Sequence, residues 1–82
     1  MTNKLFIGNL SRGVTKEQLK NHFTKIGKVT NVKVIIDSEG LGKGYGFIEM
    51  ESVEQAQKAK EVLNHTEIDG MKIEIKDEKY QP

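Results

Sequence analysis

Aromatic and charged side chains share one face of a single predicted strand, in the segment KGYGFIEM at residues 43–50. Successive side chains of a strand point to opposite faces of the sheet. One face of this segment therefore carries two rings, Tyr45 and Phe47, between Lys43 and Glu49, while the other carries glycines and aliphatic side chains. Exposed rings can stack on unpaired nucleic-acid bases, and lysines can attract phosphates. These residue types at this spacing indicate non-covalent binding of single-stranded nucleic acid.

The length and composition are those of one small intracellular domain. The 82 residues leave room for a single core, and the absence of cysteine excludes disulfides and zinc-thiolate sites. The first ten residues lack the apolar run of a signal peptide, and no segment reaches transmembrane length. We therefore expect a soluble, cytoplasmic monomer (or a nuclear one if the source is eukaryotic), with no membrane partner and no cofactor.

The hydrophobic pattern predicts elements in the order β-α-β-β-α-β. Each helix begins with a capping box, formed by Thr15 with Gln18 and by Ser52 with Gln55. The dipeptide DG at 69–70 predicts a tight turn before the last strand. The predicted elements span, in chain order, residues 4–10, 15–27, 29–36, 43–50, 52–64 and about 71–76. This order indicates an α+β fold of the ferredoxin-like, split βαβ type, with two helices on one face of a four-stranded antiparallel sheet.

One face of this sheet must be exposed, because 82 residues supply no third layer. Each strand has an aliphatic side that suits the helices, and these sides hold Leu5, Ile7, Val32, Val34, Ile36, Ile48, Met50, Ile73 and Ile75. The opposite sides hold Lys4, Phe6, Gly8, Asn31, Lys33, Ile35, Lys43, Tyr45, Phe47, Glu49, Lys72, Glu74 and Lys76. Burying five lysines and two glutamates would carry a prohibitive desolvation cost. The aromatic side is therefore predicted to be open and net cationic, although the whole chain has a charge of only +1.

The glycines of the third predicted strand have a packing role in this arrangement. Gly44 and Gly46 fall on the aliphatic side, where we expect helix backbone to approach closely. Together with the glycines at 40 and 42 they do not form a nucleotide-binding loop, because the spacing fits neither glycine-rich pattern and a strand follows rather than a helix.

Two short segments also resemble a known family. LFIGNL at residues 5–10 and KGYGFIEM at 43–50 are similar to the two ribonucleoprotein motifs of the RNA recognition motif family. They occur in the family's order and on adjacent strands of the expected topology. The resemblance covers nearly the whole chain and implies one domain over residues 1–82, with a core at about 3–77 and a short tail at 77–82.

The resemblance implies a role for each matching residue. Phe6, Tyr45 and Phe47 would stack on bases, and Lys43 would contact a backbone phosphate. The implied function is a single-stranded RNA-binding module without chemistry of its own, for which single-stranded DNA is a second expected ligand. Further contacts to phosphates are expected from the other lysines of the open face, chiefly Lys4, Lys33 and Lys76.

Three features depart from the family pattern. Met50 stands at the eighth octapeptide position, which is usually aromatic; it faces the helices, so the change concerns packing. The loop DSEGLG at 37–42 is slightly short for the family. The tail KDEKYQP is typical of small stand-alone members or of an excised domain, and Tyr80 within it is expected either to fold back to the sheet edge or to be disordered.

Two other classes of function fit the sequence less well. A protein-interaction domain on the same fold would use the sheet or the helix face, but such members of the family typically lack the three sheet rings. An enzyme similar to the acylphosphatases would need a phosphate cradle, which the surroundings of the single arginine, Arg12, do not supply. His22 and His65 lie far apart, with His22 expected to be partly buried, and Asp77 and Glu78 are interpreted as tail charges. We therefore predict neither a metal site nor an enzyme.

Overall fold

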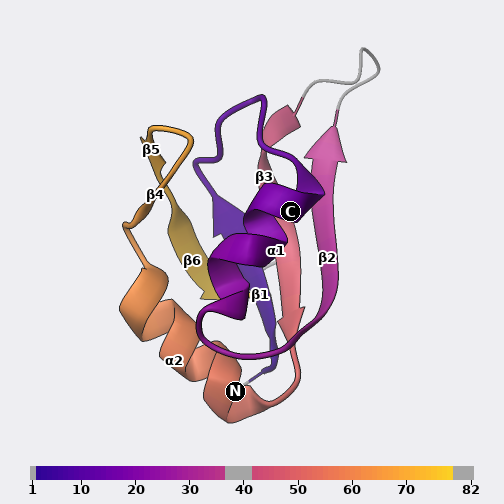
Figure 1. Cartoon of the computed structure of the whole chain (residues 1–82), viewed down its shortest axis with the longest axis vertical. Helices are drawn as coiled ribbons and strands as arrows, with labels where there is room; N and C mark the ends of the chain where they lie inside the picture. Colours follow the sequence, from indigo (N-terminus) through magenta and orange to yellow (C-terminus); the bar gives the residue numbers. More distant parts are fainter. Residues whose placement is uncertain (1, 37–41, 79–82) are drawn as a thin grey trace.

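The computed structural model describes residues 2–36 and 42–78, except for the side chains of residues 36, 42 and 43. The predictions for the loop at 37–41 and for Tyr80 lie outside these residues. Figure 1 shows the elements, which are β1 (Lys4–Gly8), α1 (Lys16–Thr24), β2 (Val29–Ile36), β3 (Gly42–Met50), α2 (Val53–Leu63), β4 (Glu67–Ile68), β5 (Met71–Lys72) and β6 (Glu74–Asp77).

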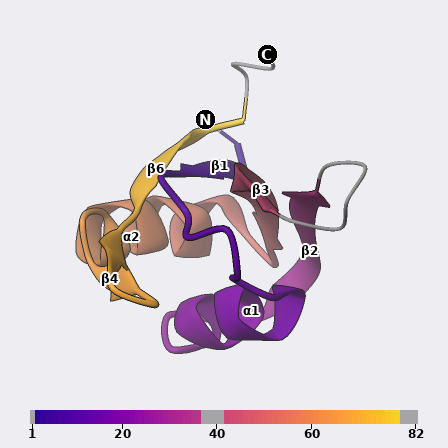
Figure 2. The same ribbon diagram turned by 90° about the horizontal axis from the view of Figure 1, so that it is seen from above.

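Four of the strands form one antiparallel sheet in the order β2-β3-β1-β6. Figure 2 shows α1 and α2 on the same side of this sheet. The predicted ferredoxin-like arrangement is therefore confirmed. The two strands that carry the ribonucleoprotein motifs, β1 and β3, lie next to each other in the middle of the sheet.

The core lies between the helices and the aliphatic side of the sheet, as predicted. Leu19 and Phe23 of α1 are fully buried there, as is Ala59 of α2. From the predicted aliphatic set, Val32 and Val34 are partly buried against the core. The fully or nearly fully buried members of that set are Leu5, Ile7, Ile48, Met50, Ile73 and Ile75. Burying these side chains supplies the main stabilising free energy of the fold, because removing apolar surface from water is the dominant favourable term.

The two helix starts differ, which corrects one prediction. At α1 the capping box is complete: Thr15 Oγ1 accepts from the Gln18 N–H, and Gln18 Oε1 accepts from the Thr15 N–H. At α2 the structure records only the first half, a hydrogen bond of 3.2 Å from the Gln55 N–H to Ser52 Oγ. The Gln55 side chain instead packs on Gly27, where an added Cβ would lie 2.5 Å from Gln55 Cδ.

Gly27 therefore serves packing rather than helix termination. Helix α1 ends at Thr24, three residues before the predicted end at residue 27. The Gln55 Oε1 atom is buried and makes no hydrogen bond with the described residues. The absence of a side chain at residue 27 is what allows Gln55 to lie in this position.

The glycines of β3 have a different neighbour from the one predicted. A Cβ at Gly46 would lie 2.5 Å from the backbone oxygen of Lys33 and 3.3 Å from Leu19 Cδ2. The close approach therefore comes from β2 and from a helix side chain, and not from helix backbone. Gly44 has a φ of 91° where the pairing of β2 and β3 is irregular, a conformation that other residues rarely adopt.

The prediction of one continuous last strand at about 71–76 is wrong, because the structure has two short strands there. Met71 and Lys72 form β5, which pairs with β4 in a separate hairpin, and only β6 joins the main sheet. Ile73 separates the two strands. Its backbone N–H donates to the Thr66 carbonyl oxygen, and its carbonyl oxygen accepts from the His65 backbone N–H. Lys72 therefore belongs to the hairpin and not to the open face of the main sheet.

Candidate nucleic-acid interface

Three aromatic rings form a cluster on the side of the main sheet opposite the helices. Phe6 and Phe47 are direct partners across β1 and β3, and Tyr45 is the partner of Gly8. The Phe6 and Tyr45 rings are stacked with centroids 5.6 Å apart, while Phe6 and Phe47 meet edge to face at 5.7 Å. Tyr45 and Phe47 are 6.3 Å apart, also edge to face. All three rings are half-buried, so part of each stays accessible.

Gly8 provides the space in which this cluster is built. It lies on the same side of β1 as Phe6, and a Cβ at this position would lie 3.2 Å from the Phe6 ring. Because Gly8 also pairs with Tyr45, its missing side chain leaves room above the strand for both rings. In the motif LFIGNL, the spacing of an aromatic residue followed two residues later by glycine thus has a local steric cause.

Three of the predicted lysines surround the ring cluster. Lys33 is the partner of Phe47 on β2, and Lys76 is the partner of Phe6 on β6. Phe47 and Phe6 therefore lie between two lysines in one row across the sheet, in the order Lys33, Phe47, Phe6, Lys76. Lys4, at the start of β1, is the third, and all three side chains are exposed. The side chain of Lys43 lies outside the described residues, so its contact with phosphate stays a prediction.

The negative charges on this face are more numerous than the sequence indicated. Glu78 was interpreted as a tail charge, but its N–H donates to the Lys4 oxygen at 3.0 Å, which continues the β6–β1 pairing. Asp77, likewise assigned to the tail, forms an ion pair of 3.1 Å with Lys60 of α2. The described part of the face thus carries three lysines against Glu49, Glu74 and Glu78, and the cationic excess predicted for it is not found among these residues.

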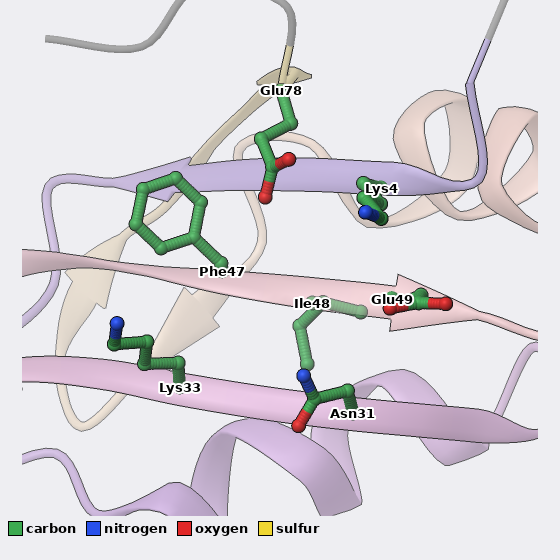
Figure 3. Close-up of a pocket in the computed structure, with 7 residues that line it drawn as sticks. All are labelled: Lys4, Asn31, Lys33, Phe47, Ile48, Glu49 and Glu78. Carbon is green, nitrogen blue, oxygen red and sulfur yellow. The ribbon is translucent and has the colours of Figure 1, made fainter.

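A hollow of about 210 Å³ opens beside the Phe47 ring (Figure 3). Its lining consists of Lys4, Asn31, Lys33, Phe47, Ile48, Glu49 and Glu78. In Figure 3 the Glu78 carboxylate projects over β1 between Phe47 and Lys4, and the Lys33 side chain extends from β2 toward Phe47. The alternation of side chains places Asn31 and Glu49 on this face. The same alternation, continued past Lys76, would place Glu78 there, but the extent of the last strand depends on its pairing with β1.

The other titratable candidates have structural positions. His22 is half-buried on α1, and its Nε2 lies 2.8 Å from Thr66 Oγ1. Burial and, to a smaller extent, the charge of Lys25 lower the pKa of His22 below its ordinary value of 6.5. Among residues 2–36 and 42–78, no three histidine or carboxylate side chains are grouped to hold a metal ion. No described helix is long and apolar enough to cross a membrane.

The fold and the ring cluster define the class: a ferredoxin-like α+β domain with an aromatic sheet face. Within this class the chain belongs to the RNA recognition motif family, whose model matches residues 5–74. The family suggested by the two motifs is thereby confirmed.

Several known proteins are similar to the chain. The 29 kDa ribonucleoprotein, chloroplastic, of Arabidopsis thaliana is 40% identical over 81 residues, which cover 98% of this chain and 24% of that protein. The crystal structure of RNA Binding Protein PG1 shows 35% identity and a TM-score of 0.88, with 99% of both chains covered. The RRM of Rna15, solved with bound RNA, shows 25% identity and a TM-score of 0.88 over 98% of this chain and 86% of that one. The chain spans only about a quarter of the length of the first two curated relatives.

Proposed function

We propose that this chain binds single-stranded RNA on the β1–β3 face and catalyses no reaction. The observation that supports this most directly is the cluster of three rings in mutual contact on the sheet side away from the helices. Isolated aromatic side chains on a surface need no explanation, but a half-buried cluster flanked by lysines suits unpaired bases, whose π-faces stack on rings. A double helix cannot use this surface, because its bases are already stacked and paired.

Two kinds of side chain contribute to the proposed binding, aromatic rings and lysines. Phe6, Tyr45 and Phe47 supply stacking, which is worth roughly 1–3 kcal/mol per base. The lysines in the row across the sheet neutralise phosphates and hold the strand in register. The structure of Rna15 with bound RNA supports this assignment by analogy, as do the relatives named as ribonucleoprotein and RNA-binding protein.

Other expectations from the sequence stay predictions. They are the binding of single-stranded DNA, the monomeric state, the absence of enzyme activity, and the division into a core at about 3–77 and a short tail. The expected cytoplasmic location is one of them, and two similar Arabidopsis proteins carry the word chloroplastic in their names. Fractionation of the source cells and light scattering would test the location and the monomeric state.

The proposal is tested by NMR titration with a random pool of single-stranded nonanucleotide RNAs, with duplex RNA as the comparison. Amide signals around Phe6, Tyr45 and Phe47 should shift with the single strands, and the duplex should shift them much less. Shifts concentrated on the outer faces of α1 and α2, for example at Glu17 and Lys58, would contradict the assigned surface. No shift with any RNA would contradict the function and would favour a protein-interaction role for the domain.

A further inference from the structure

The carboxylates beside Phe47 are unexpected on a surface proposed to bind a polyanion. Glu49 and Glu78 both line the hollow, together with Lys4 and Lys33, so its formal charges cancel. Carboxylates accept hydrogen bonds and cannot donate them when ionised, and they repel phosphates. A hollow of this composition is therefore poorly suited to a phosphate group. It suits a neutral ring that presents hydrogen-bond donors and acceptors side by side.

The position of Glu78 is fixed by the fold. Its backbone N–H donates to the Lys4 oxygen, and this bond holds the residue against β1 immediately after β6 ends. Figure 3 shows its carboxylate extending over the sheet toward the hollow, whereas the Glu49 carboxylate points along β3 toward the end of the strand. Of the two acids, Glu78 is thus the one placed to contact a base lying on Phe47.

The size of the hollow limits its occupant. Its volume of about 210 Å³ is below the range of roughly 300–1,000 Å³ that is typical of sites for drug-sized ligands. One flat wall is the Phe47 ring, and the polar groups stand around it. A single nucleobase stacked on the ring would direct one of its edges to these polar groups.

Only one of the four RNA bases has an edge that matches this set. Guanine presents two adjacent donors, N1–H and the N2 amino group, which a carboxylate can accept in parallel, and the neighbouring O6 accepts from an ammonium group. Adenine and cytosine each place a ring-nitrogen acceptor beside their amino group, and that acceptor would face the carboxylate unpaired. Uracil offers one donor between two acceptors. Leaving a polar group unpaired in such a contact is costly.

We propose that the hollow beside Phe47 selects guanine, with Glu78 accepting from N1–H and the N2 amino group and with Lys4 donating to O6. This inference rests on the proposed binding of single-stranded RNA and adds a base preference to it. In this arrangement the acceptors of Glu78 are used by a base, which offsets the repulsion between its carboxylate and the phosphates.

The test uses five nonanucleotide RNAs in which eight uridines surround one central guanosine, inosine, adenosine, cytidine or uridine. Affinities are measured by fluorescence anisotropy. The wild-type protein should bind the guanosine strand about 5- to 100-fold more tightly than the adenosine strand, which is the discrimination typical of a two-point contact to a base. Inosine lacks the N2 amino group but keeps N1–H and O6, so its affinity should lie between the two.

Glu78→Gln should remove most of the preference for guanosine over inosine, because the amide has one acceptor oxygen in place of two. Glu74→Gln is the matched control: it removes the same charge from the same face of the sheet, outside the hollow. It should keep the wild-type ratios, and thermal melting should show that both variants are folded.

Two results would overturn the guanine preference while leaving RNA binding intact. One is equal affinity of the wild-type protein for all five strands, and the other is an unchanged ratio of guanosine to inosine in Glu78→Gln. Failure of every strand to bind would instead overturn the proposed function itself, and the base preference with it.

Discussion

Phe47 and Ile48 are consecutive residues with opposite surroundings. The Phe47 ring packs edge to face on Phe6 and stays partly accessible, whereas Ile48 is 1% exposed and lies in the core. Neighbouring residues in a strand point to opposite faces, so the two side chains separate binding from folding within one dipeptide. Substituting them one at a time therefore tests which side of β3 meets RNA.

Phe47→Ala should weaken binding of single-stranded RNA by roughly 1–3 kcal/mol, the usual contribution of one stacked base. Its effect on stability should be well below the ~3–5 kcal/mol that a fully buried Phe→Ala change costs. Ile48→Ala should do the reverse and destabilise the fold by about 2–5 kcal/mol while the rings stay in place. Thermal melting and RNA titration of both variants measure the two effects. Unfolding by Phe47→Ala, with Ile48→Ala nearly silent, would contradict the assignment of the faces.

The residues that the sequence predicted are those set by local alternation. Phe6, Tyr45 and Phe47 were found because their strands alternate clearly and one side of each is aliphatic. Glu78 was missed because its position depends on pairing with Lys4, a residue 74 positions earlier in the chain. Gln55 fits a capping box by sequence, but its side chain packs on Gly27, where the glycine leaves space for it. Contacts between distant segments decided both cases.

Among the elements, β5 and β6 show where strand prediction fails. The run MKIEIK alternates well enough to predict one strand, and nothing in it marks a break. The break at Ile73 arises from its two hydrogen bonds with the segment at residues 65–66, which hold it between the hairpin and the main sheet. The predicted turn at Asp69 and Gly70 is present, with φ values of 55° and 82°. The local turn was therefore predictable, and the division of the strand was not.

Helix α1 contacts the segment before β4 through the titratable side chain of His22. His22 lies 2.8 Å from Thr66, and the lowered pKa of its imidazole means that the fold favours the neutral ring. In the unfolded chain the ordinary pKa of 6.5 applies. Between the two pKa values the unfolded state binds more protons, so stability must rise with pH in this range.

The contribution of His22 to stability should therefore be fully present above about pH 6.5 and should be lost as the pH falls through the lower pKa of the folded state. Urea unfolding of the wild-type protein and of His22→Gln between pH 7.5 and 5 measures the difference. The variant should lose less stability than the wild type over this interval. Parallel curves would mean that His22 does not titrate differently in the two states.

For the molecule as a whole, the binding of RNA should depend only moderately on salt. If Lys33, Lys43 and Lys76 each neutralise one phosphate, the slope of log K against log salt should be about −2, from roughly −0.7 per contact on a single strand. Lys33→Ala should reduce its magnitude by about 0.7. Lys58→Ala on the outer face of α2 is the control and should leave the slope unchanged. A slope near zero would indicate that the face does not contact phosphates.

The topology of the whole chain was the most predictable feature. The order of strands and helices leaves few arrangements in which short, right-handed connections can place two helices against one sheet. Both helices lie on one side of the sheet, and the described residues place no further layer on the other side. The net charge of that side was less predictable, because it depends on whether Lys72 and Glu78 belong to the sheet, and the structure reverses both assignments.

The mutual packing of the three rings has a consequence for the energetics of association. Each ring is held by the other two, at centroid distances of 5.6, 5.7 and 6.3 Å, before any ligand is present. Their rotational freedom is thus already restricted in the free protein, and a preorganised surface loses little side-chain entropy when it binds. In such an encounter most of the conformational freedom is lost by the flexible RNA strand, whose bases have to unstack from one another and settle on rings that are already in place.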